Sequence, residues 1–154
     1  MALRRAALLT ALLAAAALPQ AAAAACADPL PIDPAVVTRE MGLKAFGGAN
    51  QAGPVCQLSW QAKSGPGPSL LVYGPTWLEK MGQKFASAKQ AAERYRAESP
   101  KGVEPVPGLP GAYMVFDPKT PNRRVFAERS GKVYMIVSSD AVPLAVLAKA
   151  AAGR

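Results

Sequence analysis

Cysteine and histidine set the chemistry that this chain can carry. Its 154 residues include two cysteines, Cys26 and Cys56, and no histidine. Without histidine, the chain lacks the base of Ser-His and Cys-His nucleophile systems and a common zinc ligand. The sequence motifs of serine hydrolases, zinc proteases, phosphate-binding loops and dithiol oxidoreductases are also missing. We therefore expect no catalytic residue, no cofactor and no metal site.

Carboxylates are the remaining source of acid–base chemistry. A pair of them can hydrolyse a glycosidic bond, and the candidates here are Glu79, Glu93, Glu98, Glu104 and Asp117. Their spacing singles out no pair, because Glu79 fits a helix cap and the next two fit a solvated helix face. A carboxylate-dependent hydrolase is thus the weakest function hypothesis. Scattered methionines fit core packing better than soft-metal binding: Met41, Met81, Met114 and Met135.

The first 25 residues predict export. Arg4 and Arg5 precede an uncharged, Ala/Leu-rich run over residues 6–18, and small residues follow up to Ala25. The run is shorter than the ~20 residues of a spanning helix, so a signal peptide is favoured over a membrane anchor or a buried Ala-rich helix. We expect a signal peptide over 1–25 and one domain over 26–154, in the periplasm or secreted.

The two cysteines are expected to pair. In an oxidising compartment an even number of cysteines usually forms disulfides, and a bond between Cys26 and Cys56 would close a 30-residue loop. Two alternatives would leave Cys56 unpaired. Cleavage after Ala27 would remove Cys26, and lipidation of Cys26 would tether the protein to a membrane.

Net charge narrows the class of partner. Without Arg4 and Arg5, sixteen basic and ten acidic residues remain, which gives a net charge of +6. The basic residues are scattered and do not alternate with aromatics along a track, so we do not expect a nucleic-acid partner. Another envelope protein or an anionic envelope component fits better, and a membrane fits only if Cys26 is lipidated.

Periodicity and turn residues predict an α+β fold in a single domain. We expect an antiparallel sheet made of a hairpin (55–62 and 69–73) and a three-stranded meander (112–116, 123–128 and 132–138). A long amphipathic helix should start at a Thr76–Glu79 capping box and continue past Gly82 to Ser99-Pro100. Two shorter helices should pack with it, one from Asp33 to about Phe46 and one after Ser139-Asp140, with loops over 50–54 and 101–111.

The element order and several short motifs resemble a known group. The residues that carry the resemblance are Cys26, the helix after Asp33, Cys56 with Trp60, and Val106-Pro107-Gly108-Leu109 before Ala112-Tyr113. With them the chain resembles small secreted bacterial lipoproteins, and related non-lipidated proteins, of unknown function. These have two α-β-β units and are similar in fold to the Mog1/PsbP-like proteins. The resemblance implies a pairing of the first cysteine with the one that starts the strand. It also implies a binding or accessory module more than a catalyst.

The leading hypothesis is a non-catalytic extracytoplasmic binding or accessory protein. A specific version is an inhibitor or immunity-type module for an envelope protein, and the main alternative is a lipid-anchored envelope protein that supports transport or surface assembly. Residues at a helix start, in a basic turn and in a Pro/Gly-rich loop are the candidates for partner binding: Trp77, Arg123, Arg124 and Leu109.

Overall fold

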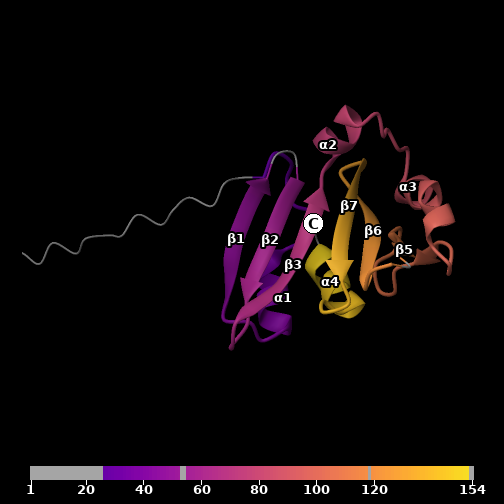
Figure 1. The fold of residues 1–154 in the computed structure, drawn as a ribbon. Coiled ribbons are helices and arrows are strands. Elements are labelled where there is room, and N and C mark those ends of the chain that lie inside the picture. Colours follow the sequence, from indigo (N-terminus) through magenta and orange to yellow (C-terminus); the bar gives the residue numbers. More distant parts are fainter. Residues whose placement is uncertain (1–25, 53–54, 118, 153–154) are drawn as a thin grey trace, which may run out of the picture.

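The fold is taken from a computed structural model, which describes residues 26–52, 55–117 and 119–152 (Figure 1). The signal peptide expected over 1–25 lies outside the described residues. Among the described residues no helix is both long enough and apolar enough to cross a membrane.

Within the described part of the chain, seven antiparallel strands form one sheet in the order β1-β2-β3-β7-β6-β5-β4. Two meanders meet at its centre, where β3 pairs with β7 and Leu71 lies opposite Val137. The strands are β1 (Ala45–Ala52), β2 (Val55–Gln61), β3 (Pro66–Tyr73), β4 (Glu104–Pro105), β5 (Tyr113–Phe116), β6 (Asn122–Arg129) and β7 (Lys132–Ser139). The predicted α+β class, a single antiparallel sheet packed by helices, is confirmed.

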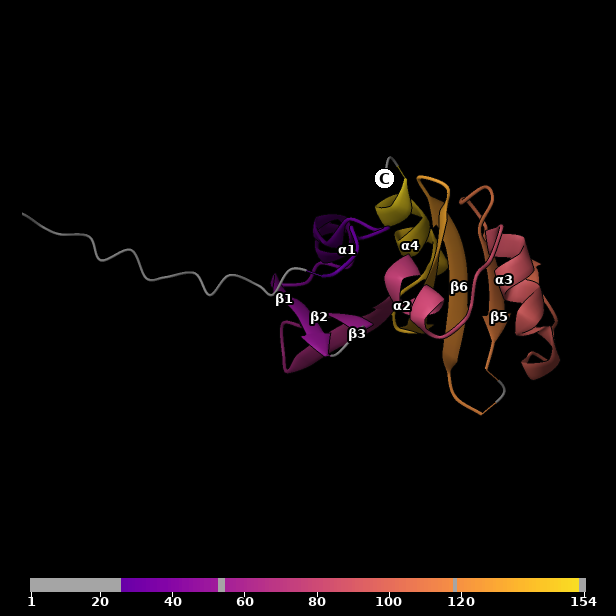
Figure 2. The ribbon, with the colours of Figure 1, turned by 90° about the horizontal axis from the view of Figure 1, so that it is seen from above.

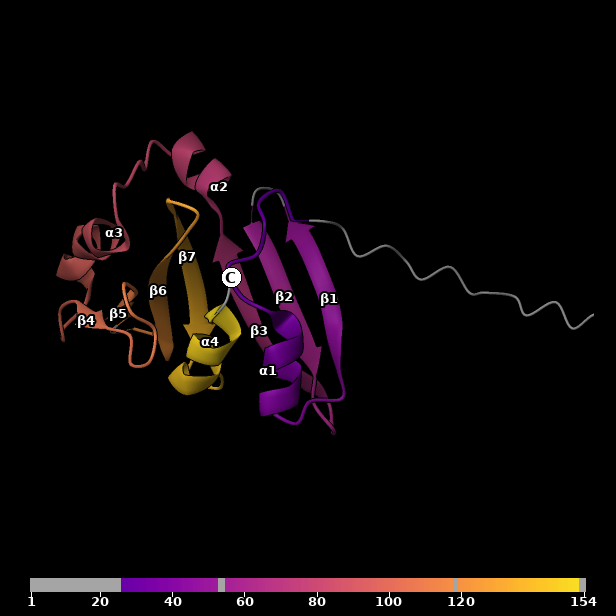
Figure 3. The same cartoon turned by 180° about the vertical axis from the view of Figure 1, so that it is seen from behind.

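The helices lie on both faces of this sheet. α1 (Pro34–Glu40) and α4 (Leu144–Ala151) pack side by side on one face, which Figure 3 shows from their side. α3 (Ala88–Arg94) covers β5 and β6 on the opposite face, and a short 3-10 helix, η1 (Arg96–Glu98), follows it (Figure 2). α2 (Pro75–Lys80) lies beside the end of β7 that adjoins the β6–β7 hairpin (Figure 1).

Alternating residues build a separate core on each face. On β7, Tyr134 and Ile136 pack in the core under α1 and α4, whereas Val133 and Met135 pack with α3 and the fully buried Phe126. β6 and β7 are therefore covered on both sides. In Figure 1 the near side of β2 and β3 carries no helix. Gln57 and Leu71 lie opposite each other on these strands and alternate with residues of the core under α1 and α4, and both are half-buried.

One part of the fold prediction is wrong, because the expected long helix is broken into α2 and α3. Gly82 has φ +71° and forms a Schellman ending: its N–H donates to the carbonyl of Glu79, and the N–H of Gln83 donates to that of Leu78. Ser87 then caps α3 by accepting from the N–H of Gln90. A glycine that we expected the helix to tolerate is its stop signal.

The first helix is also shorter than expected, and a strand follows it. α1 ends at Met41-Gly42, where Gly42 has φ +61° and the N–H of Leu43 donates to the carbonyl of Thr38. Residues 45–52 then form β1, where the sequence predicted a helix end and a loop. α1 and α2 both begin with proline and end in Met-Gly at a Schellman motif, so the two halves of the chain share a helix pattern.

Candidate binding surface

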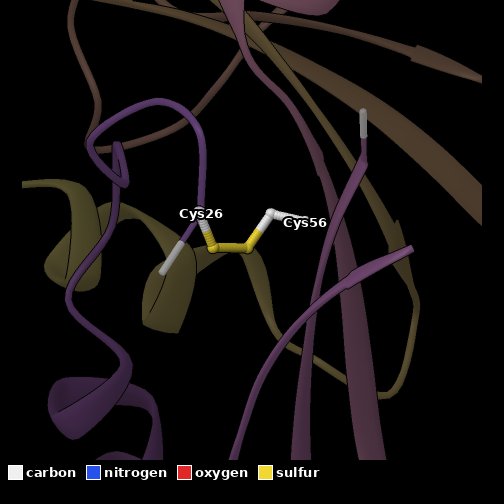
Figure 4. The surroundings of a disulfide bond; sticks show 2 residues. All are labelled: Cys26 and Cys56. Carbon is white, nitrogen blue, oxygen red and sulfur yellow. A yellow bond between two sulfur atoms is a disulfide. The ribbon is translucent and has the colours of Figure 1, made fainter. Parts of the chain in front are cut away.

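An N-terminal strap, defined here as residues 26–33, ties the chain across one end of the sheet. Figure 4 shows the disulfide between Cys26 and Cys56, whose Cα atoms are 5.6 Å apart. The strap is held further along by Arg129, which donates to the carbonyl of Leu30, and by the N–H of Asp33, which donates to the carbonyl of Ala150 at 2.7 Å. The predicted cysteine pair is confirmed, and a disulfide is consistent with an oxidising, extracytoplasmic location.

The strap also supplies the cap of α2. α2 starts at Pro75 and Gly74 is its N-cap residue, so Thr76 lies inside the first turn and the predicted Thr76–Glu79 capping box is not formed. Asp28 takes that role: its carboxylate accepts from the N–H of Thr76 at 3.1 Å and from the Thr76 hydroxyl at 2.7 Å. A Cβ at position 74 would collide with the Asp28 carboxylate, so the strap requires glycine there. The position of α2 therefore depends on the strap.

A cavity of about 170 Å³ opens between α2, the segment that follows it and the β6–β7 hairpin. Its walls are apolar where they meet the core: Leu78 and Val133 are buried and Phe85 is half-buried. Its rim carries Lys84 and Lys132, both exposed. The residues that line it are Pro75, Leu78, Glu79, Gln83, Lys84, Phe85, Gly131, Lys132 and Val133.

Side-chain hydrogen bonds hold the segment that forms this wall. The Tyr95 hydroxyl donates to Oε1 of Gln83 at 3.0 Å, and the N–H of Ala86 donates to Oε1 of Gln90 at 2.7 Å. The N–H of Ala88 donates to Glu128 on β6 at 2.8 Å. The cavity wall is thus fixed to α3 and to the sheet, and the cavity needs no rearrangement to exist.

Cationic side chains around this cavity have no acidic partner among the described residues. The ion pairs of the described residues join Arg39 and Lys149 to Glu40, Arg96 to Glu93, Arg123 to Asp140 and Arg124 to Glu98. Lys84 and Lys132 on the rim, and Lys80 and Lys89 in the flanking helices, are exposed and belong to none of them. We call these four lysines with Met81 and the cavity the α2 surface.

Met81 marks the same place. It is 58% exposed, and among the described residues it is the one large hydrophobic residue that is exposed. It lies between Lys80 and the cavity-lining Gln83 in the chain. Nearby, Trp77 is half-buried and packs edge-on against Tyr73, with ring centroids 4.7 Å apart. Methionine is among the side chains that are enriched at protein–protein interfaces.

The predicted partner-binding residues are not brought together. Trp77 lies next to the α2 surface. Arg124 lies on the same face of the sheet as Trp77, but at the other side of α3. It pairs with Glu98 at 2.6 Å, and its guanidinium carbon lies 5.1 Å from the Tyr95 ring centroid. Leu109 is half-buried against the core of the opposite face.

Arg123 is placed inside the protein. Its side chain is 8% exposed, it donates to the carbonyl of Val142, and its Nη1 lies 3.6 Å from Asp140. Burial lowers the pKa of Arg123, and Asp140 partly opposes this effect. This arginine holds the turn before α4, so we do not include it in the proposed surface.

Three of the five candidate carboxylates have local partners. Glu93 pairs with Arg96, Glu98 pairs with Arg124, and Asp117 accepts from the N–H of Lys119 at 2.8 Å, a bond that lowers the pKa of Asp117. No group of three or more Cys, Asp or Glu within the described ranges could hold a metal ion. What the arrangement offers chemically is a small cavity with both apolar and polar lining residues, bordered by cations, which sequence reasoning missed. Gly82, by ending α2, was the signal that could have located it.

Comparisons with other proteins leave the family open. Neither protein-family models nor curated protein sequences nor solved structures give a significant match to this chain.

Proposed function

We propose that this protein is a non-catalytic extracytoplasmic binding module that uses the α2 surface to hold another envelope protein. The observation that carries the proposal is the coincidence of a cavity with a partly apolar lining, exposed Met81 and lysines without ion-pair partners at one end of the sheet. Interfaces are enriched in methionine and aromatic side chains, and unpaired surface charge favours a partner of opposite sign. An inhibitor or immunity-type module is the specific form that we propose.

The disulfide favours the untethered form of the protein over the lipid-anchored alternative. A lipid on Cys26 would be attached through its sulfur, and the same sulfur is bonded to Cys56. The likeness to Mog1/PsbP-like proteins remains part of this proposal. It is supported by the order of the elements, since each half of the chain has helix followed by antiparallel strands.

Capture of a partner tests this proposal. The mature protein is crosslinked gently in an envelope extract from the cells that make it. We expect one protein in stoichiometric amount with the wild type and none with the Lys84→Glu/Lys132→Glu variant. Lys44→Glu/Lys63→Glu is the matched control, because it makes the same charge change at exposed lysines elsewhere. Failure to recover a partner with the wild type, or equal loss in both variants, would contradict the proposal.

A further inference from the structure

We infer that the cavity of the α2 surface receives one apolar side chain from an acidic segment of the partner protein. This inference rests on the proposed function and names the chemistry of the partner. It depends on three properties of the site: the size of the cavity, the polarity of its walls and the sign of the charge at its rim.

Size restricts the occupant. Pockets that bind small molecules usually measure about 300–1,000 Å³, whereas this cavity measures about 170 Å³. A whole cofactor or metabolite does not fit, but a single side chain does. One anchor residue inserted in a preformed pocket is a common feature of protein interfaces.

Wall polarity defines the part of the partner that enters. Leu78 and Val133 at the base are buried, and Phe85 forms a half-buried side. The amide of Gln83, which also lines the cavity, accepts the hydrogen bond from Tyr95. Glu79, Lys84 and Lys132 make the remainder of the lining polar. An aliphatic or aromatic side chain that reaches Leu78, Phe85 and Val133 is removed from water there, which favours its entry.

Rim charge defines what must flank that side chain. Lys84 and Lys132 stand on two sides of the opening, and Glu79 is the one acidic residue among the lining residues. Lys80 and Lys89 add two positive charges on the flanking helices, and none of these lysines pairs with a described carboxylate. A segment with carboxylates on both sides of its anchor complements this arrangement. An anionic lipid surface is a less suitable occupant, because polar lipid headgroups at the lysines would leave the cavity itself unfilled.

Synthetic peptides test the inference. The probes are short peptides rich in aspartate and glutamate with a single central leucine, and a control series has serine in its place. Titrations of the intact mature protein are followed by amide chemical shifts in NMR. We expect the leucine peptide to bind at least about fivefold more tightly than the serine peptide, with shifts at Leu78, Phe85 and Val133. Binding should weaken with added salt, because exposed charges are screened.

Variants and vesicles complete the test. Lys84→Gln/Lys132→Gln should weaken the leucine peptide about fivefold or more, while Lys44→Gln/Lys63→Gln should not, and unchanged melting curves verify that both variants fold. Equal binding of the two peptides, or shifts at other residues, would overturn the inference. Binding to phosphatidylglycerol vesicles without peptide binding would overturn it in favour of a membrane. If a partner is captured in a lysine-dependent manner but no peptide binds, the proposed function stands and this inference fails.

Discussion

Removal of the disulfide should destabilise the protein by an amount that follows from its place in the chain. Cys26 and Cys56 are 30 residues apart. The chain-entropy relation for a loop of that length gives about 3.6 kcal/mol at 25 °C. At the length of the mature domain, 1 kcal/mol shifts Tm by about 4 °C, so we expect Tm to fall by about 14 °C. The variant is Cys26→Ser/Cys56→Ser, and circular dichroism melts measure the change.

The same substitution should loosen the cap of α2. In the wild type, Asp28→Ala removes both bonds to Thr76 and should cost about 0.5–2 kcal/mol, as loss of a cap does. In the Cys26→Ser/Cys56→Ser background the strap has lost its anchor, so Asp28→Ala should cost clearly less there. A double-mutant cycle from urea unfolding measures this coupling.

Two results would refute this reasoning about the strap. One is a wild-type melting curve that does not change with reductant, although intact mass shows that the thiols have become free. The other is an equal cost of Asp28→Ala in both backgrounds, which would show that the cap does not depend on the disulfide.

Further expectations concern the helix stop, the core and two titrating groups. Gly82→Ala should cost about 1–2 kcal/mol in urea unfolding, because φ at this position is +71°. Phe126→Ala, at a fully buried position between α3 and the sheet, should cost about 3–5 kcal/mol by the same measurement. The hydrogen bond from Lys149 lowers the pKa of Glu40. The ionised Glu40 therefore contributes to folding stability at neutral pH, and this contribution is lost as pH falls through the lowered pKa. Glu40→Gln should therefore reduce stability in neutral but not in acidic urea series. Burial and the nearby charge of Asp28 raise the pKa of Tyr134, so folding stability should decrease as pH rises above about 10. Melting curves at alkaline pH measure this decrease, and it should be smaller in Tyr134→Phe.

The sequence was sufficient for the class of fold because the strand signals are local. Alternation in 55–62 and 132–138, and the turns at Gly65-Pro66 and Ser130-Gly131, correspond to observed strands and hairpins. The disulfide could be predicted because only two cysteines are present. These features depend on residues next to one another or on simple pairing.

The α2 surface could not be predicted in the same way. A continuous apolar stripe through Met81, Phe85 and Ala88 favoured one helix. A glycine inside such a stripe can either be tolerated by the helix or end it, and the tertiary contacts around it decide which. Those contacts come from residues distant in the sequence. Asp28, 48 residues before Thr76, caps α2, and Glu128, 40 residues beyond Ala88, accepts from the first N–H of α3. For Arg123 the sequence led to the opposite mistake. We expected the basic pair Arg123-Arg124 to be exposed in a turn, but both residues belong to β6, which places successive side chains on opposite faces of the sheet and buries Arg123.

Photocrosslinking in intact cells is the most direct test of the α2 surface. A photoreactive amino acid replaces Met81 in one version of the protein and Ala35, exposed on α1 at the opposite face of the sheet, in another. We expect that position 81 gives one discrete crosslinked protein and that position 35 gives none. Crosslinks of equal yield from both positions, or from position 35 alone, would contradict it.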